Sequence, residues 1–321
     1  MSKQLSMYSF VMPVHNESAG LSDFHKSLLD VLKDNGLNDY ELIYVDDGST
    51  DDTAKFIDKL ASGNQQIKLV KLSRNFGKEI ATTAGIHEAI GAAIVTLDAD
   101  GQHPVGLIPQ FIDRWKSGAK VVIGMRSANQ KEGLVKRYGS KLFYKLFNRF
   151  SGVELVPGST DFRLIDRVVQ QDFVRMTERN RITRGLIDWL GYERDYIYFK
   201  ANPRLAGEAS YSFKKLFKLA VDSTISLSVS PLYIAAYIGA IILPVSILMG
   251  LFMLVDLILG DPTHLHATGS AYLIVLVLFL VGVLLVSQAI IGLYLSHIHA
   301  ETQNRPLYII DKAGSANLNE T

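Results

Sequence analysis

The chain has 321 residues, with 33 Lys and Arg against 32 Asp and Glu, so its net charge is only +1. This balance gives no charge signal for nucleic acid, and we expect no nucleic-acid partner. Because the sequence contains no cysteine, disulfides and thiolate metal sites are excluded.

The N-terminal residues lack the apolar core and cleavage site of a signal peptide. Strand-like and helix-like patterns then alternate, which predicts an α/β fold with a mainly parallel, doubly wound sheet. We expect strands at residues 8–12, 40–45, 67–72, 93–97 and 119–123, and helices at 21–33, 53–61 and one ending at 90. Pro13 is expected to end the first strand. No Gly-x-Gly-x-x-Gly or Walker-A sequence occurs, so dinucleotide-binding and P-loop folds lack support.

Carboxylates follow three of these strands. Glu17 comes after the first, Asp46 and Asp47 after the second, and Asp98 and Asp100 after the fourth. The carboxyl ends of parallel strands meet at one edge of a sheet, so we expect these loops to converge. Two carboxylates one residue apart favour a shared cation, and oxygen ligands with a substrate diphosphate suit Mg²⁺ or Mn²⁺. Taken alone, each loop also fits a simple turn and helix cap.

Basic and apolar residues are combined between residues 131 and 150. Leu and Phe recur there mostly three or four positions apart, among six Lys or Arg. This pattern predicts an amphipathic helix at a membrane interface. Residues 206–230 resemble a second interfacial segment. A solvated basic face packed on a soluble domain is the alternative for both.

Two long uncharged segments follow, at residues 231–255 and 271–296. As helices they would be roughly 37–39 Å long, more than the ~30 Å hydrocarbon core of a bilayer. They predict a two-helix transmembrane hairpin, with a pair of buried core helices as the alternative. Basic residues flank the hairpin and are absent from loop 260–269, which predicts cytoplasmic termini. Small and polar residues in the spans favour a homo-oligomer, for example a tetramer.

The expected organisation therefore has four parts. A cytoplasmic domain covers residues 1–205, an interfacial segment 206–230, the transmembrane hairpin 231–298 and a cytoplasmic tail 299–321. The polar end of the tail after Lys312 is expected to fray.

Six motifs together resemble family 2 glycosyltransferases of the GT-A fold. They are Val11–Glu17, Val45–Ser49, Ser73–Glu79, Asp98–Gln102, Thr160–Leu164 and Arg204–Tyr211. Within that family the chain looks like the polyprenyl-phosphate glycosyltransferases, such as the bactoprenol glucosyltransferases and dolichol-phosphate mannose synthase. With the two spans added, the resemblance covers nearly the whole chain. The chain departs from the common pattern at Gly106, where many relatives have a carboxylate.

The resemblance implies roles for residues in and near these motifs. The Mg²⁺ or Mn²⁺ ion would be held by Asp98, Asp100 and Gln102. The nucleotide-sugar would contact Pro13, Val14, Glu17, Asp46, Asp47, Lys78, Asp98 and Ala99. The acceptor or diphosphate groups would contact Arg126, Arg137, Arg163, Arg204 and Ser210. Asp161, Asp100 and Arg204 would be catalytic, with Arg204 as a diphosphate clamp and Asp161 either as a base or as a group that positions Arg163.

The resemblance also implies a reaction and a location. A single sugar, glucose from UDP-glucose as the leading choice, would be transferred with inversion to a polyprenyl phosphate such as undecaprenyl phosphate. The expected site of this reaction is the cytoplasmic face of the bacterial inner membrane. UDP-N-acetylglucosamine, UDP-galactose, a modified arabinose donor and GDP-mannose stay open as donors.

Two other functions are weighed against this one. A processive polysaccharide synthase predicts a Gln/Arg-x-x-Arg-Trp motif, which residues 181–186 only faintly resemble. A non-catalytic membrane partner that binds nucleotide-sugar is the other alternative. The presence of Asp98, Asp100 and Arg204 argues against lost activity.

Overall fold

The structure is a computed structural model that describes residues 7–127, 158–179, 181–200 and 269–318, with the single positions 248 and 258. These residues belong to two units. The first unit contains the described residues up to 200 and those from 305 onward, and the second contains helix α10 (Gly269–Thr302). Both expected interfacial segments lie outside the described residues, as does the first expected span apart from position 248.

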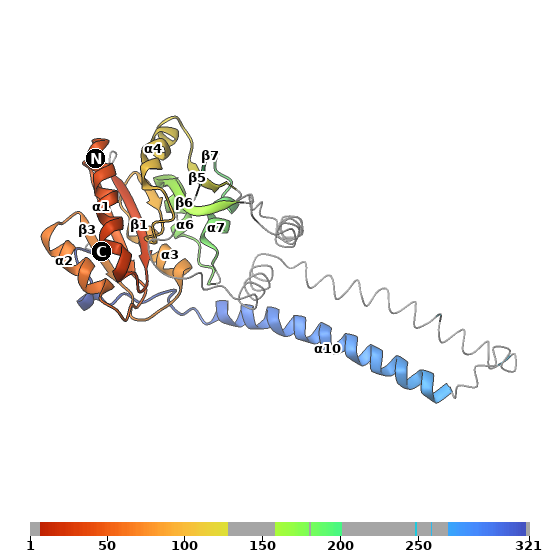
Figure 1. The fold of residues 1–321 in the computed structure, drawn as a ribbon. Helices are drawn as coiled ribbons and strands as arrows, with labels where there is room; N and C mark the ends of the chain where they lie inside the picture. The colour runs from red at the N-terminus through yellow and green to blue at the C-terminus, as the bar shows by residue number, and fades with distance from the viewer. Residues whose placement is uncertain are drawn as a thin grey trace. The chain divides into compact units, whose positions relative to one another are not determined.

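A seven-stranded sheet with the order β3-β2-β1-β4-β6-β5-β7 forms the centre of the first unit (Figure 1). Its strands are β1 (Tyr8–Val14), β2 (Tyr40–Asp46), β3 (Ile67–Lys71), β4 (Ala93–Thr96), β5 (Val121–Arg126), β6 (Ser159–Asp166) and β7 (Arg194–Phe199). Strand β6 is antiparallel to β4 and β5, and the other neighbouring pairs are parallel. The expected mainly parallel α/β sheet is therefore confirmed.

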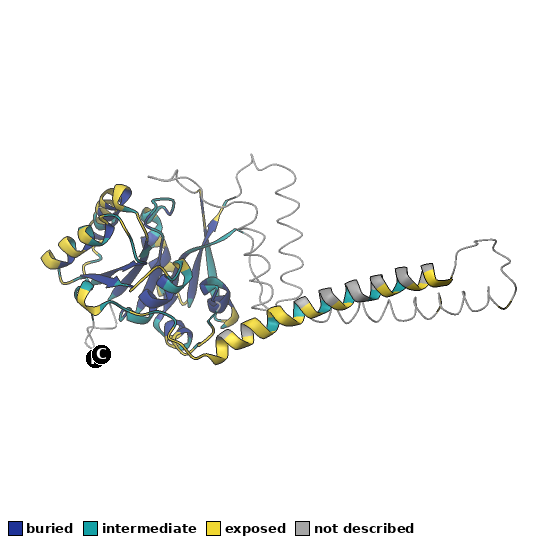
Figure 2. Cartoon of the chain, turned by 90° about the horizontal axis from the view of Figure 1, so that it is seen from below, coloured by how far each residue is buried: buried dark blue, intermediate teal, exposed yellow. Residues whose placement is uncertain are grey.

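Helices cover both faces of this sheet. They are α1 (Ser18–Asp34), α2 (Thr53–Gly63), α3 (Lys78–Glu88), α4 (Ile108–Lys116), α6 (Arg167–Val174) and α7 (Thr183–Trp189). Residues of α1, α2 and α4 share one buried cluster with alternate strand residues, and residues of α3, α6 and α7 share the other. This division follows from the two-residue period of a strand, which sends neighbouring side chains to opposite faces. Figure 2 shows the buried strands in dark blue between partly exposed helices.

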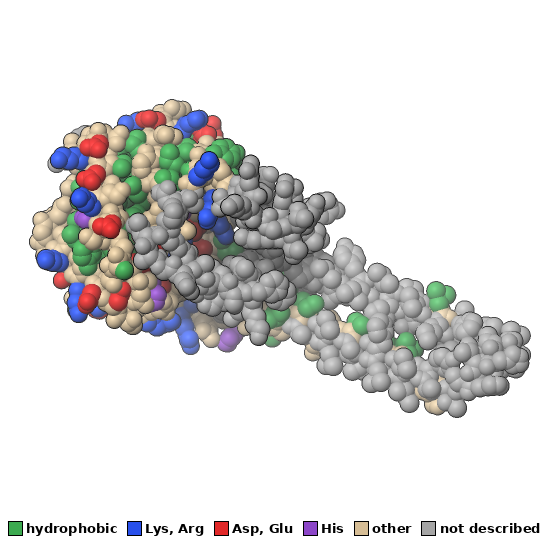
Figure 3. Space-filling model, in the orientation of Figure 1, with side chains coloured by type: hydrophobic (Ala, Val, Ile, Leu, Met, Phe, Trp, Pro, Cys, Tyr) green, Lys and Arg blue, Asp and Glu red, His purple; other side chains and the backbone are tan. Residues whose placement is uncertain are grey.

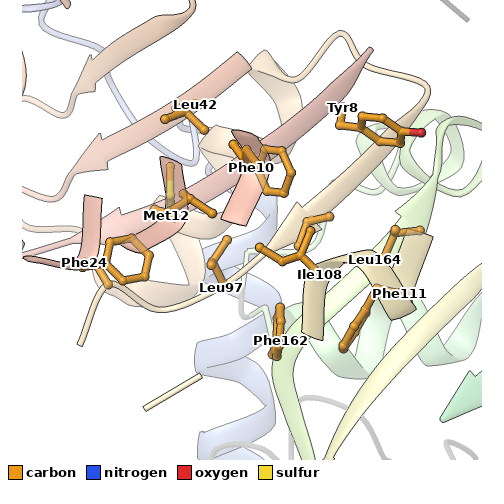
Figure 4. Close-up of a cluster of buried hydrophobic side chains, with 14 of the residues drawn as sticks. Tyr8, Phe10, Met12, Phe24, Leu42, Leu97, Ile108, Phe111, Phe162 and Leu164 are labelled. Atoms are coloured by element: carbon orange, nitrogen blue, oxygen red, sulfur yellow. The ribbon is translucent and has the colours of Figure 1, made fainter. Parts of the chain in front are cut away.

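The larger core cluster brings the first strand next to the later half of the fold. Phe10 and Met12 of β1 point to the same face, where they meet Leu97 and Phe162 (Figure 4). The ring of Phe162 stacks on Phe111 of α4, with 4.4 Å between ring centroids. Helix α4 thus packs on β6, while the pairing of β6 with β4 places the residue before Phe162 beside the end of β4.

The expectation that Pro13 ends the first strand is wrong. Strand β1 continues to Val14, and Pro13 is in register with Val45 of β2. On the other side of β1, the backbone N–H of Leu97 donates to the Val11 carbonyl, just past the end of the β4 pairing. Alternate residues of a strand direct their backbone N–H and C=O groups toward the same neighbouring strand. The nitrogen of Pro13 therefore faces the β4 side, as the carbonyl of Val11 does, and the pairing with β4 has already ended there. No ladder hydrogen bond is lost there.

The expectation that the polar tail frays after Lys312 is also wrong. Ala316 forms an antiparallel bridge with Leu69 of the edge strand β3. The side-chain amide of Asn317 donates to three backbone carbonyls, at 2.8–3.3 Å. The tail is held by hydrogen bonds to an otherwise open strand edge, and hydropathy does not reveal such contacts.

Helix α10 has 34 residues and contains the second segment that the sequence marks as a membrane span. Among the described residues, no helix combines the length and the hydropathy needed to cross a membrane. The two-helix hairpin is therefore not confirmed and stays a prediction.

Charged side chains of both signs are interspersed on the face of the first unit that Figure 3 shows. Ion pairs of the first unit include Arg114 with Asp195 at 3.0 Å and Lys120 with Asp166 at 3.0 Å.

Candidate active site

The loops after β1 and β2 are joined by hydrogen bonds. The side-chain carbonyl of Asn16 accepts from the backbone N–H of Thr50 at 2.8 Å, and the backbone N–H of Glu17 donates to the Thr53 hydroxyl at 2.9 Å. Asn16 has a positive φ of 56°, a conformation that Asn tolerates better than most residues. The expected convergence of these two strand ends is present in the structure.

Asp47 connects the same edge to the loop that leads into α3. This carboxylate is 3% exposed and accepts the backbone N–H groups of Phe76 at 2.7 Å and Gly77 at 2.9 Å. Burial raises the pKa of Asp47, and the two donated hydrogen bonds act in the opposite direction. The contact fixes the backbone immediately before Lys78.

Gly48 explains why the two loops can approach so closely. Its φ is +67°, and a Cβ atom there would lie 2.6 Å from the backbone nitrogen of Asn75. Any side chain at this position would push the two loops apart. Next to it, Asp46 is fully buried and accepts the Ser49 N–H at 3.1 Å, while its second carboxylate oxygen has no hydrogen-bond partner among the described residues.

Lys78 lies at the centre of the site. Its Nζ is 2.7 Å from Asp98 at the end of β4 and 2.8 Å from Asp161 on β6. Burial opposes ionisation of Asp161, but the nearby cations Lys78 and Arg184 outweigh it and lower the pKa of this carboxyl. Burial likewise opposes the charge on Lys78, yet the two carboxylates raise its pKa. The sequence alone did not predict this contact of Lys78 with both carboxylates.

The loop after β4 is held by His103. Its Nδ1 accepts the backbone N–H of Asp98 at 3.0 Å, and its ring stacks on Phe162 with 5.2 Å between centroids. The ring is 7% exposed, and burial lowers its pKa, which favours the neutral form that can accept this bond. No role for His103 follows from the sequence, where the only signal is its place directly after the Asp98–Gln102 motif.

Asp98 and Asp100 suit a divalent metal ion by their chemistry. Mg²⁺ usually binds proteins through one or two carboxylates together with substrate phosphates. The Asp98 side chain is 24% exposed, and Asp100 accepts the backbone N–H of Gln102 at 3.0 Å. Within the described ranges, no group of three or more His, Cys, Asp or Glu could hold a metal by itself.

Other expected site residues are spread around this edge. Val14 and Ala99 are buried, Pro13 is half-buried, and Arg126 is exposed at the end of β5. Three further expected residues lie outside the described part of the chain, namely Arg137, Arg204 and Ser210.

The expectation that Arg163 contacts a substrate phosphate does not fit its position. Its side chain is 1% exposed, and its Nη1 lies 2.8 Å from Asp188 of α7. Its Nε also donates to the backbone carbonyl of Thr160 at 3.0 Å. A guanidinium that is buried and paired in this way joins β6 to α7.

The family of the chain is shown by comparison with known proteins. Residues 9–173 match the family described as glycosyl transferase family 2. An uncharacterized glycosyltransferase of Synechocystis is 39% identical over 303 residues, which cover 94% of this chain and 94% of that protein. The bactoprenol glucosyl transferase of Shigella phage SfII is 35% identical over 312 residues, which cover 96% of this chain and 99% of the phage protein.

One solved structure with a similar fold is glucosyl-3-phosphoglycerate synthase from Mycobacterium tuberculosis, in complex with Mn²⁺, UDP-glucose and phosphoglyceric acid. It is 21% identical, with coverage of 69% of this chain and 78% of that chain and a TM-score of 0.44. The family match and the near-full-length relatives confirm the resemblance to the bactoprenol glucosyltransferases. The chain belongs to glycosyltransferase family 2.

Proposed function

We propose that this glycosyltransferase moves one sugar from a nucleotide-sugar to a polyprenyl phosphate and releases a nucleoside diphosphate. The observation that carries the proposal is the contact of Lys78 with both Asp98 and Asp161. In this contact the Lys78 ammonium lies between Asp98, a carboxylate suited to a donor-bound metal, and a second carboxylate, that of Asp161. Relatives that match along almost the whole chain are named bactoprenol glucosyl transferases, which supports the lipid acceptor.

UDP-glucose is the donor that we propose first, because those relatives are glucosyl transferases by name. UDP-N-acetylglucosamine, UDP-galactose, a modified arabinose donor and GDP-mannose are the alternatives. UDP-N-acetylglucosamine differs from UDP-glucose in one substituent, UDP-galactose in the configuration at one carbon, the arabinose donor in being a pentose, and GDP-mannose in both sugar and base. A pocket can distinguish such differences only through contacts with the groups that differ.

The transfer itself asks little of a general base. A phosphate monoester has a second pKa of roughly 6, so the acceptor is largely dianionic at neutral pH. Its oxygen forms a bond to the anomeric carbon while the bond from that carbon to the diphosphate oxygen breaks, with inversion. No proton has to leave the attacking oxygen, which agrees with an Asp161 whose pKa is lowered by Lys78 and Arg184. Asp161 then orients charge at the site and does not remove a proton.

Asp98 and Asp100 would hold the divalent ion, with Gln102 as a further oxygen ligand. Such an ion stabilises negative charge on the departing diphosphate as a Lewis acid. Asp47 and the Lys78 loop would lie on the nucleoside side of the site, because Asp47 fixes that loop through Phe76 and Gly77.

We further propose that the chain is anchored in the bacterial inner membrane with both termini and the catalytic unit in the cytoplasm. The uncharged segments at 231–255 and 271–296 and the flanking basic residues support this arrangement. A lipid phosphate lies at headgroup level, so an anchored site shortens the search for its acceptor. A homo-oligomer is part of the same proposal.

The test uses the purified full-length protein in detergent with undecaprenyl phosphate, Mg²⁺ or Mn²⁺, and a set of radiolabelled nucleotide-sugars. We expect label from one donor to enter the organic phase, and we expect chelator or Asp100→Ala to abolish it. Asp58→Ala, an exposed carboxylate on α2, is the matched control and should leave transfer unchanged. Nucleotide binding without transfer from any donor would refute the enzyme proposal and favour a binding module.

A further inference from the structure

The position of Lys78 is determined by the first turn of α3. Lys78 is the first residue of that helix, and the preceding Gly77 has a φ of 99°. On one side the turn is held by Asp47, through the N–H groups of Phe76 and Gly77. The Lys78 side chain is 45% exposed, so packing alone does not hold its ammonium group between the two carboxylates.

Glu79 holds the same turn from the other side. Its Oε2 accepts the backbone N–H of Thr183 at 2.8 Å, and the Thr183 hydroxyl lies 3.4 Å from the Glu79 carbonyl. Thr183 begins helix α7, is 5% exposed and lies more than a hundred positions away in sequence. Burial raises the pKa of Glu79, and the bond from Thr183 opposes that effect.

Helix α7 is in turn bound to the strand that carries Asp161. Asp188, near its end, pairs with the buried Arg163 of β6 at 2.8 Å. The hydroxyl of Thr96, the last residue of β4, donates to the backbone carbonyl of Asp161 at 2.6 Å. The helix with Lys78 and the strand with Asp161 are therefore both tied to α7.

A small pocket lies where these elements meet. Its lining includes Lys78, Glu79, Thr96, Asp161, Arg163 and Thr183. Lys78 and Asp161 both line this pocket, and their charged groups are in contact at 2.8 Å. Glu79 and Thr183 line it as well, and the hydrogen bond between them joins α3 to α7 there.

We infer that Glu79 is a positioning residue, which uses α7 as a brace to hold Lys78 between Asp98 and Asp161. In this role it acts as a hydrogen-bond acceptor, and its partner is the neutral backbone N–H of Thr183. The inference rests on the proposed function for its kinetic test, and on the structure alone for its second test.

The first test compares sugar transfer by Glu79→Gln and Glu79→Leu in the full-length protein. The amide oxygen of Gln can still accept from Thr183, so this variant should keep kcat within about threefold of wild type. Leu cannot accept, and a displacement of about 1 Å at a catalytic group can lower kcat about a hundredfold. The dissociation constant for the nucleoside diphosphate, measured by calorimetry, should change far less, since Asp47 still holds the preceding loop.

Glu88→Leu is the matched control, because it makes the same change at the other end of α3. It should leave kcat unchanged. A purely structural role for Glu79 would lower the melting temperature and nucleotide binding together with kcat, and that result would overturn the inference. Equal loss of kcat in the Gln and Leu variants would overturn it as well, since it would assign the effect to charge.

The second test does not need activity. In a crystal structure of Glu79→Leu, the Lys78 ammonium should have left Asp161, while in Glu79→Gln both contacts near 2.8 Å should remain. Unchanged contacts in the Leu variant would refute the inference. If the wild-type protein transferred no sugar, the proposed function would fail while this structural test still decided the role of Glu79.

Discussion

The buried pair of Arg163 and Asp188 offers a direct test of how the sheet is joined to α7. Both side chains are 1% exposed, and two of their atoms, Nη1 and Oδ1, are 2.8 Å apart. Asp188→Ala leaves the guanidinium of Arg163 buried without its counter-charge. Removing one partner of a buried pair costs about 3–5 kcal/mol, because the remaining charge has lost its water and gained nothing in return.

That cost is large compared with the ~5–15 kcal/mol stability of an ordinary domain. For a unit of this size, about 1 kcal/mol shifts the melting temperature by roughly 2–4 °C, so the variant should melt roughly 6–20 °C lower. The double variant Arg163→Met with Asp188→Leu removes both charges of this pair and should recover most of the loss, although Arg194 also loses Asp188, 4.0 Å away. Recovery stays incomplete because the carbonyls of Thr160 and Arg184 lose the donors that Arg163 provides.

Unfolding can be followed by tryptophan fluorescence in the detergent-solubilised full chain, which has only 2 Trp. Trp115 is the useful probe, since its indole N–H donates to Asp166 at 2.8 Å in the folded unit. Asp52→Ala is the control, because it breaks the exposed ion pair with Lys55 and should leave the melting temperature unchanged. A melting temperature of Asp188→Ala close to that of wild type would refute the reasoning.

Three further predictions concern stability. Asn317→Gly keeps the φ of 54° but removes the three tail hydrogen bonds. It should lower the free energy of unfolding, measured by denaturant titration, by about 1–3 kcal/mol. Gly85→Ala should cost about 1–3 kcal/mol in the same assay, because a Cβ there overlaps the Val11 side chain. Burial lowers the pKa of His87 from 6.5 to about 4, so the unfolded chain binds a proton between these values that the folded chain does not. Stability should decrease as the pH falls from about 6.5 to about 4, and His87→Gln should flatten the slope in this range.

The strands with a strong apolar pattern were predictable along the chain. The strand expected at 40–45 occurs as Tyr40–Asp46, and that expected at 93–97 as Ala93–Thr96. Strand β6 was not predicted as a strand, although Thr160 to Leu164 was noted as a motif. It is antiparallel and lies between β4 and β5, and no local pattern encodes which strands a segment will join.

The candidate site likewise contains residues that the sequence marks and residues whose role depends on tertiary contacts. Asp47, Asp98 and Asp161 could be named from sequence, because polar loops at strand ends and the family motifs mark them. Glu79 and His103 could not be assigned a role, since their effect depends on partners from other elements. Arg163 shows the converse error, in which a basic residue in a motif was read as a ligand contact although the fold buries it.

The sequence by itself determined the α/β class, the edge of the sheet where polar loops gather and the family to which the chain belongs. These depend on local periodicity, on turn-forming residues and on motifs, which are properties of short segments. Only the tertiary structure decided that Lys78 lies between two carboxylates, that Arg163 pairs with Asp188 and that the tail closes the β3 edge. Each of those contacts joins residues at least twenty positions apart, and hydrogen bonds and ion pairs at such separations form only when the strands and helices that carry them have packed.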